Sequence, residues 1–182
     1  MSGEFRGKPS ITLTGFMFSG KSRVGRELAG RLGLRFVDLD SEIERAAGTP
    51  VGEIFAVEGE SGFRRLEREA VARVLPHPGQ VVAAGGGAVV DPDNLALIAG
   101  HSCVVWLKVA PQTVLERWKQ SKGRLRPLLQ VDDPEREIIR LMQERRSFYQ
   151  ECDFSVECDG LTVEEAAGAV LERLDTGATG QQ

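Results

Sequence analysis

The sequence predicts an α/β domain in which helices cover both faces of a parallel sheet, and two observations lead to this prediction. Five short apolar segments alternate along the chain with segments of helical periodicity. Strands that are apolar throughout are typical of parallel sheets with both faces buried. Residues 15–22, GFMFSGKS, also fit the phosphate-binding pattern G-x-x-x-x-G-K-[ST] between an expected strand and an expected helix.

The expected elements follow one another with short connections. We expect strands at 11–14, 35–40, 81–84, 103–107 and 154–158. We expect helices at 24–32, 41–47, from 50 to a break at 59–62, at 63–75, a short one after 91, and at 112–119, 134–149 and 162–174. The polar, basic stretch 121–133 lacks clear periodicity and predicts a mobile loop.

Length and composition indicate one globular domain. The 182 residues suit a single domain with its core at about 11–174, and we expect 176–182 to be a disordered tail. The net charge of −4 argues against a general nucleic-acid binder. No segment approaches the roughly 18 apolar residues of a membrane span. A polar N-terminus and three cysteines without a C-x-x-C pair favour the cytoplasm, where we expect a monomer without membrane partners.

The glycine-rich loop has the residues needed to hold a nucleotide triphosphate. Glycines let successive backbone N–H groups turn toward phosphate oxygens, and the N-terminus of the following helix adds about half a positive charge. Lys21 is expected to reach the β- and γ-phosphates, and Ser22 Oγ to bind Mg²⁺. The predicted ATP-binding residues of the loop are Gly15, Phe16, Met17, Phe18, Ser19, Gly20, Lys21 and Ser22.

Asp38 and Asp40 stand at the end of the second expected strand. Side chains two residues apart on a strand point to the same side, so we expect the two carboxylates to face the phosphate loop together. They could then serve Mg²⁺ and a substrate hydroxyl. The alternative is that Asp40 caps the helix that follows.

Arg64 and Glu67 are three residues apart and share one helix face. They could form a solvated ion pair worth less than about 1 kcal/mol, or part of a basic binding spot. Arg145, near the end of a long helix, could complement the helix dipole or form a fork for a substrate carboxylate.

Three consecutive glycines, 85–87, follow the third expected strand. Such a run is costly in chain entropy and indicates close approach of the backbone to a ligand. The strand itself offers no aspartate for a metal, so Mg²⁺ would depend on Ser22, phosphate oxygens, water and Asp38. The basic loop carrying Arg126 could be a solvated loop or a closing one that stabilises phosphoryl charge and excludes water.

Six motifs in order give the chain a family resemblance. GFMFSGKS, FVDLD, GESGFRRLE, AAGGGAV, GRLRPLL and MQERRSFY together resemble shikimate kinases, members of the nucleoside-monophosphate-kinase-like P-loop group, over about residues 11–174. The resemblance implies a three-layer αβα P-loop kinase fold with a five-stranded parallel sheet of order 2-3-1-4-5. It also implies a substrate-binding subregion at about 40–70, a mobile lid at about 120–133, and phosphorylation of the 3-hydroxyl of shikimate with ATP and Mg²⁺.

The resemblance also implies roles for single residues. Asp40 is similar to the aspartate that contacts the acceptor hydroxyl, and Asp38 to the one that supports the metal through water. Arg64 and Arg145 resemble the pair that grips the shikimate carboxylate. The remaining implied contacts are Glu67 as an acid of the substrate pocket, Gly85, Gly86 and Gly87 as backbone contacts to substrate, Arg126 as the lid arginine at the phosphates, and Arg117 as an arginine stacked on adenine.

Two departures from the family pattern keep alternatives open. Phe18 stands where the family usually has a glycine, and 159–163 lacks the usual proline of the adenine side. One alternative is a related kinase such as a gluconate kinase, although the FRRLE and GGG segments favour shikimate. The other is a nucleotide-binding protein that Phe18 has disabled. A GTPase is disfavoured because the sequence has no N-K-x-D motif.

Overall fold

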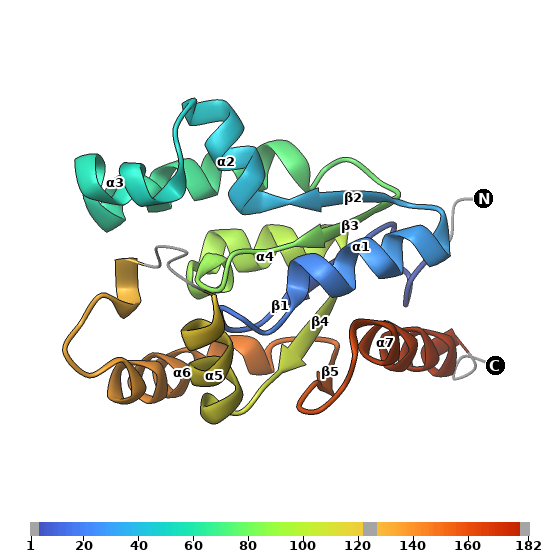
Figure 1. Cartoon of the computed structure of the whole chain (residues 1–182). Coiled ribbons are helices and arrows are strands. Elements are labelled where there is room, and N and C mark those ends of the chain that lie inside the picture. The colour runs from blue at the N-terminus through green and yellow to red at the C-terminus, as the bar shows by residue number, and fades with distance from the viewer. Residues whose placement is uncertain (1–3, 122–126, 179–182) are drawn as a thin grey trace.

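The centre of the molecule is a five-stranded parallel sheet of order β2-β3-β1-β4-β5 (Figure 1). The computed structural model describes residues 4–121 and 127–178. The strands are β1 (Ile11–Thr14), β2 (Arg35–Asp38), β3 (Gln80–Ala83), β4 (Cys103–Lys108) and β5 (Phe154–Glu157). This confirms the predicted fold class and strand order. Because β1 is the central strand, the loop that follows it opens at the middle of the carboxyl edge.

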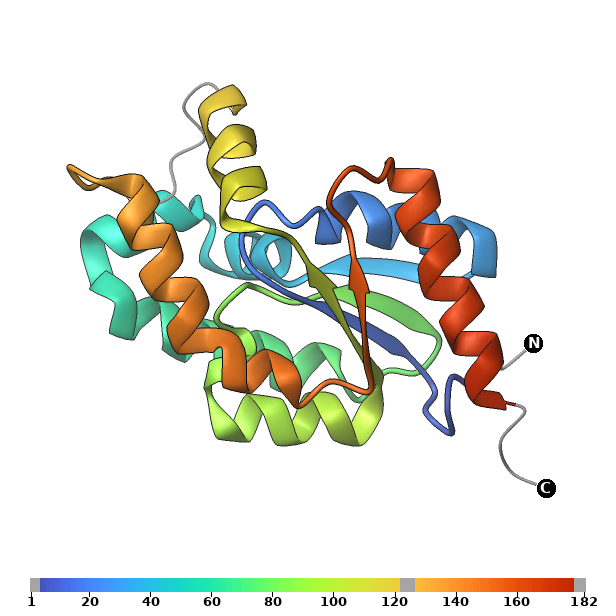
Figure 2. The same ribbon diagram turned by 90° about the horizontal axis from the view of Figure 1, so that it is seen from below.

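Helices cover both faces of this sheet. They are α1 (Lys21–Leu32), α2 (Leu39–Ala47), α3 (Val51–Val74), α4 (Pro92–His101), α5 (Pro111–Gln120), α6 (Pro134–Gln150) and α7 (Val163–Ala178), with short 3-10 turns η1 (Ala88–Val90) and η2 (Pro127–Leu129). Figure 2 shows α1 and α7 on one side of the sheet and α3 and α4 on the other. Among the described residues, no helix has both the length and the apolar character to cross a bilayer.

The apolar strands serve two cores at once. Val81 and Val82 are both fully buried, yet Val81 packs in the cluster with α1 and α7, and Val82 packs in the cluster with α3 and α4. Successive strand residues point to opposite faces, and here both faces are covered. This is why the strands are apolar throughout. The site is built on the carboxyl edge of this buried sheet.

The second strand ends earlier than predicted. β2 stops at Asp38, and α2 begins at Leu39, so Asp40 lies in the first helical turn. The predicted alternation of Asp38 and Asp40 along a strand is therefore wrong, and so is the alternative in which Asp40 is the cap. Asp38 is the N-cap, and its Oδ1 accepts a hydrogen bond from the Asp40 amide at 3.1 Å.

Two helices also differ from the sequence prediction. The expected break at 59–62 is a kink at Gly59, where φ is 69° and ψ is −171°, and α3 continues on both sides of it. Glycine adopts this backbone conformation without steric cost, so one residue is enough to redirect the helix. At the other end of the chain, α7 runs to Ala178 and so includes the start of the expected tail, while 179–182 lie outside the described residues. The last buried residue described in α7 is Leu174, and the helical backbone continues beyond it to Ala178.

Candidate active site

The glycine-rich loop joins the central strand to the N-terminus of α1. Gly15 and Gly20 have φ values of 137° and 96°, which favour glycine. A Cβ on Gly15 would also lie 2.5 Å from the carbonyl oxygen of Leu107, so no side chain fits there. Ser19 is buried and Gly20 caps α1. The loop therefore presents backbone amides beside a helix N-terminus, an arrangement that binds phosphate groups.

Lys21 lies back against this loop. Its Nζ donates hydrogen bonds to the carbonyl oxygens of Gly15 and Phe16 at 2.8 and 2.9 Å, and to Ser19 Oγ at 3.4 Å. The ammonium group is thus held at the mouth of the amide cradle by neutral acceptors. A phosphate oxygen would be a stronger, charged acceptor for the same group.

Ser22 and Asp38 bring two oxygen donors together. Ser22 Oγ, in the first turn of α1, donates to Asp38 Oδ2 at 2.5 Å. A hydroxyl and a carboxylate are ligands that suit Mg²⁺, which also keeps several waters and binds substrate phosphates. In the parts of the chain that the structure describes, no group of three His, Cys, Asp or Glu side chains could hold a metal. The pair therefore fits an ion that takes its other ligands from the nucleotide and water.

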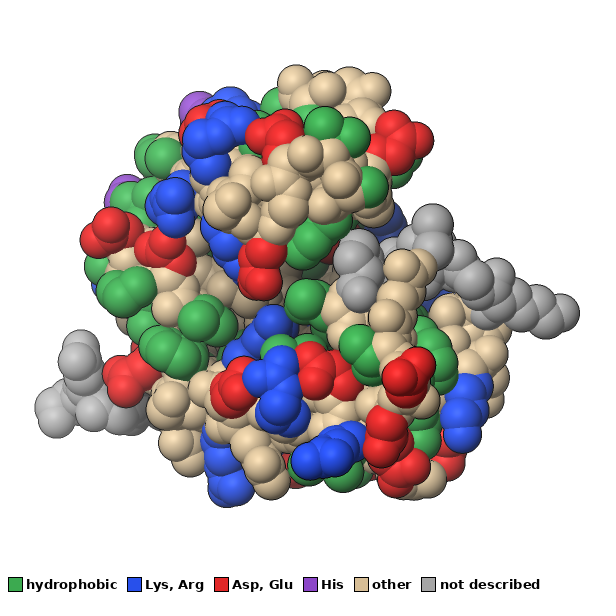
Figure 3. All heavy atoms as spheres, turned by 90° about the vertical axis from the view of Figure 1, so that its left-hand side faces the viewer, with side chains coloured by type: hydrophobic (Ala, Val, Ile, Leu, Met, Phe, Trp, Pro, Cys, Tyr) green, Lys and Arg blue, Asp and Glu red, His purple; other side chains and the backbone are tan. Residues whose placement is uncertain are grey.

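A pocket opens beside the phosphate loop, and the face in Figure 3 is hollowed there, with Lys and Arg side chains in the hollow. Its apolar lining consists of Met17, Val51, Phe55, Phe63 and Leu128. Its polar lining consists of Asp40, Arg64, Glu67 and Arg145, with the Gly85–Gly87 backbone between them. An apolar wall with a few convergent charged groups is typical of a small-molecule site.

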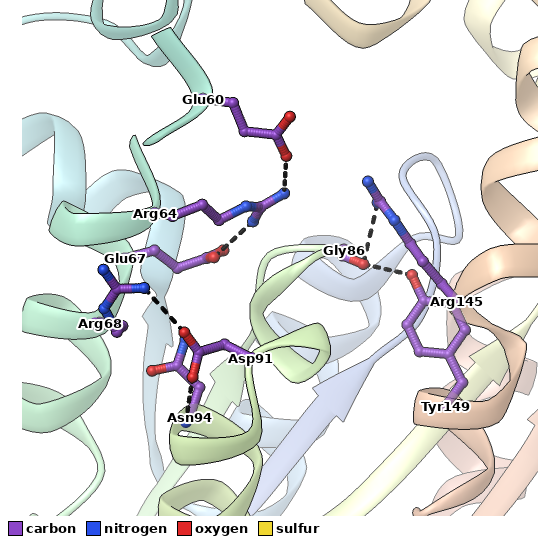
Figure 4. Close-up of polar contacts among 9 residues, drawn as sticks. All are labelled: Glu60, Arg64, Glu67, Arg68, Gly86, Asp91, Asn94, Arg145 and Tyr149. Atoms are coloured by element: carbon purple, nitrogen blue, oxygen red, sulfur yellow. Dashed lines mark hydrogen bonds and ion pairs between the residues drawn. The ribbon is translucent and has the colours of Figure 1, made fainter. Parts of the chain in front are cut away.

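Arg64 is held in this pocket by two carboxylates. Its Nη1 donates to Glu67 Oε2 at 2.6 Å and its Nη2 to Glu60 Oε1 at 3.0 Å (Figure 4). The Glu67 side chain is only 1% exposed, so the interpretation as a solvated ion pair is wrong. Burial raises the pKa of Glu67, Arg64 opposes that rise, and the negative charge of Asp40 adds to it. Glu67 Oε1 is buried and has no hydrogen-bond partner within the described residues.

The glycine run lies in a closely packed part of the site. A Cβ on Gly85 would lie 2.8 Å from Glu67 Oε1 and 3.2 Å from Asp40 Oδ1. A Cβ on Gly86 would lie 3.3 Å from the Gly15 carbonyl oxygen, and one on Gly87 would lie 2.5 Å from the Arg64 guanidinium nitrogens. The three glycines thus let the acids, the phosphate loop and Arg64 approach one backbone segment. The predicted contact of this backbone with substrate stays a prediction.

Arg145 reaches the pocket from the opposite side. Figure 4 shows Arg64 extending from α3 and Arg145 from α6 toward the space above Gly86. Arg145 is 8% exposed, its Nη1 donates to the Gly86 carbonyl at 3.3 Å, and its guanidinium lies 5.7 Å from the centre of the Phe16 ring. It therefore points into the site rather than into solvent at the helix end, which favours the predicted carboxylate fork over a helix-dipole role.

The sequence comparisons agree with this geometry. The family model described as shikimate kinase matches residues 17–175. The chain belongs to the shikimate kinase family. A shikimate kinase from Thermodesulfovibrio yellowstonii is 40% identical over 173 residues, which cover 93% of this chain and 99% of that protein. One from Stenotrophomonas maltophilia strain R551-3 is 46% identical over 169 residues, which cover 92% of this chain and 93% of that protein.

Solved structures separate this family from its wider fold group. The shikimate kinase from Acinetobacter baumannii in complex with shikimate has a TM-score of 0.90 at 34% identity, covering 96% of this chain and 97% of that chain. A gluconokinase from Sinorhizobium meliloti has a TM-score of 0.57 at 17% identity, covering 93% and 95%. The similarity to the gluconokinase shows only that the two proteins share a fold.

The nucleotide side carries the departure from the shikimate kinase pattern. Phe18 has a φ of 62°, a left-handed conformation that costs most residues roughly 1–2 kcal/mol. Its carbonyl oxygen accepts a hydrogen bond from Arg117 Nη1 at 2.8 Å, which links α5 to the loop. Arg117 thus lies beside the loop, where the adenine contact is predicted. Arg126 and the rest of 122–126 lie outside the described residues, and Leu128 brings the end of the expected lid to the pocket.

Sequence reasoning missed Tyr149 and the aromatic wall of the site. Tyr149 donates a hydrogen bond to the Gly86 carbonyl at 2.5 Å from α6, the helix that carries Arg145. A signal existed, because Tyr149 is four residues from Arg145 and so shares its helix face. Phe55 and Phe63 stack with ring centres 4.8 Å apart and line the pocket. Their helical spacing is equally typical of core residues, so the pattern could not assign them to a site.

Proposed function

We propose that the protein transfers the γ-phosphoryl group of ATP to the 3-hydroxyl of shikimate. One observation carries the proposal: the phosphate loop and the acid-binding arginines border the same pocket. The Gly86 segment joins them, since a Cβ on Gly86 would lie 3.3 Å from the Gly15 carbonyl oxygen, and the Gly86 carbonyl accepts a hydrogen bond from Arg145. A phosphate donor and a carboxylated acceptor bound on the two sides would meet with little further ordering, which lowers the entropic part of the barrier.

On the donor side, the loop amides at 15–20 and Lys21 hold the phosphates. Lys21 leaves its carbonyl partners for the β- and γ-phosphate oxygens and stabilises the charge that develops there. Ser22 and Asp38 would hold Mg²⁺, which when bound offsets phosphate charge. Arg117 stacks on the adenine, and Arg126 closes over the phosphates as part of the lid, excluding water from the transferring group.

On the acceptor side, Arg64 and Arg145 bind the shikimate carboxylate as a pair of forks. Glu67 holds Arg64 in place and balances its charge. Asp40 accepts the proton of the attacking hydroxyl or orients it. The hydroxyl oxygen forms the new bond to phosphorus, the bond from phosphorus to the bridging oxygen breaks, and ADP leaves with the bonding electron pair.

We further propose that the enzyme acts as a cytoplasmic monomer without nucleic-acid or membrane partners. The free thiols Cys103, Cys152 and Cys158 support a reducing compartment. The charge distribution supports a small anionic substrate, because the basic groups of the site converge in a pocket rather than on an open face.

A coupled assay with ATP, Mg²⁺ and shikimate tests the proposal. We expect turnover with shikimate and at least a hundredfold slower turnover with gluconate, since Arg64 and Arg145 are placed for a compact ring acid. Lys21→Ala should lower kcat by roughly two to three orders of magnitude by removing a charge-stabilising donor. Equal turnover rates for wild type and Lys21→Ala would reject the mechanism. Binding of both substrates without turnover would instead support the disabled protein.

A further inference from the structure

The carbonyl oxygen of Gly86 accepts hydrogen bonds from two residues one turn apart on α6. Tyr149 donates its hydroxyl at 2.5 Å, and Arg145 donates Nη1 at 3.3 Å (Figure 4). Gly86 is half-buried at the pocket wall, between these donors and the phosphate loop. Arg145 is thus placed to serve two acceptors, this carbonyl and an anion in the pocket, whereas a phenol has one hydrogen to donate.

Tyr149 is fixed in its position by packing. Its side chain is 2% exposed within the core formed by α2, α3 and α4, and its ring lies 5.5 Å from that of Trp106 on β4. Burial raises the pKa of Tyr149 to about 12, against the opposing effect of nearby Arg145. The hydroxyl therefore stays protonated at working pH and can donate to Gly86 throughout.

Arg145 is held less firmly. Its contact with Gly86 is the longer of the two, and its guanidinium carbon lies over the face of the Phe16 ring, 5.7 Å from the ring centre. A guanidinium has five N–H donors and gains most from a bidentate carboxylate. Turning toward such a ligand would withdraw one donor from Gly86 at the moment when the bound ligand excludes water from that carbonyl.

We propose that Tyr149 is a positioning residue that keeps the Gly86 carbonyl paired while Arg145 turns to the carboxylate of the acceptor. The proposal rests on the proposed function, in which Arg145 binds that carboxylate. An unpaired carbonyl in a dry pocket carries a desolvation penalty, and the tyrosine bond removes it.

Tyr149→Phe tests this, because it removes only the hydroxyl and keeps the ring against Trp106. We expect KM for shikimate to rise about tenfold, equivalent to about 1.4 kcal/mol, with kcat and KM for ATP within about twofold of wild type. In an Arg145→Ala background the same change should alter KM for shikimate less than about twofold, because water then enters the space that the arginine side chain vacates and pairs with the carbonyl. Equal losses in both backgrounds, or an unchanged KM in the wild-type background, would overturn the proposal.

The two hypotheses fail in different ways. If Arg145→Ala leaves KM for shikimate unchanged, the proposed carboxylate contact is wrong; if it raises KM and Tyr149→Phe does not, only the role of Tyr149 is wrong. A second measurement does not depend on whether Tyr149→Phe folds. The chain has a single tyrosine, so fluorotyrosine labelling gives one fluorine resonance. Shikimate should shift it in the wild-type sequence and not with Arg145→Ala, and an unshifted wild-type resonance would contradict the proposal.

Discussion

Glu67 places a carboxyl group where water is almost excluded. Its side chain is 1% exposed, its Oε2 pairs with Arg64, and burial raises its pKa. A buried acid with one strong partner and a second acid nearby is costly to ionise. The residue is therefore kept at a cost to stability for what it does to Arg64 and Asp40, which is typical of functional sites.

Glu67→Gln should reveal that cost as a pH-dependent difference in stability. The native state holds the Glu67 proton more tightly than the unfolded chain, so wild type loses stability as pH rises from the ordinary glutamate value of 4.5 through the raised native pKa. We expect the variant to gain unfolding free energy relative to wild type across that window. Urea unfolding of both proteins from pH 4 to 7 measures this, and a constant difference would show that Glu67 titrates normally.

Phe18 is a second residue under local constraint, since it takes a left-handed φ of 62° in the phosphate loop. We expect Phe18→Gly to be more stable than Phe18→Ala by about 1 kcal/mol, because alanine keeps the steric cost and glycine does not. At Gln143, an exposed position in the middle of α6, the order should reverse, with alanine better by about 1 kcal/mol. Denaturant melts of the four variants test both orders. If the alanine variant is the more stable one at both positions, the backbone at Phe18 is unstrained.

At the scale of elements, the junction of β2 and α2 combines two roles in Asp38. Oδ1 caps α2 through the Asp40 amide, and Oδ2 accepts from Ser22. The sequence could not place this boundary, because Leu39 is fully buried and its apolar character suits a strand end and a helix start equally. The cap itself decides the boundary, and it moves Asp40 onto a helix beside the glycine segment.

The two roles of Asp38 can be separated by substitution. Asp38→Asn should keep the cap, so unfolding free energy should change by less than about 0.5 kcal/mol, while the Mg²⁺ concentration for half-maximal rate rises. Asp38→Ala should lose both, including about 1 kcal/mol of stability. Asp91→Ala is the matched control: it removes the cap of α4 and should cost stability without changing the Mg²⁺ requirement. An unchanged Mg²⁺ requirement in Asp38→Asn would remove Asp38 from the metal site.

At the scale of the whole molecule, the sequence predicted the layers better than the contacts across them. The apolar segments and the phosphate-loop pattern predicted a parallel sheet. The family resemblance implied the strand order and the pairing of Arg64 with Arg145. Contacts between distant segments carry no local signal. Tyr149 and Gly86 are 63 positions apart, and Gly85 and Gly87 lie against side chains from α2 and α3, while Gly86 lies against the backbone of the phosphate loop. Helical spacing could place Tyr149 beside Arg145, but its contact with Gly86 becomes visible only when the fold brings the two segments together.

The pocket takes its two arginines from helices far apart in the sequence, since Arg64 belongs to α3 and Arg145 to α6. An acid bound by both arginines should therefore stabilise the folded chain. At a ligand concentration about one hundred times Kd, linkage predicts about 2.7 kcal/mol and a clear rise in Tm. At the same concentration, shikimate should no longer stabilise Arg145→Ala. ATP with Mg²⁺ should stabilise that variant as much as it stabilises wild type. Thermal melts with each ligand separate the two sites, and undiminished stabilisation of Arg145→Ala by shikimate would place the acid elsewhere.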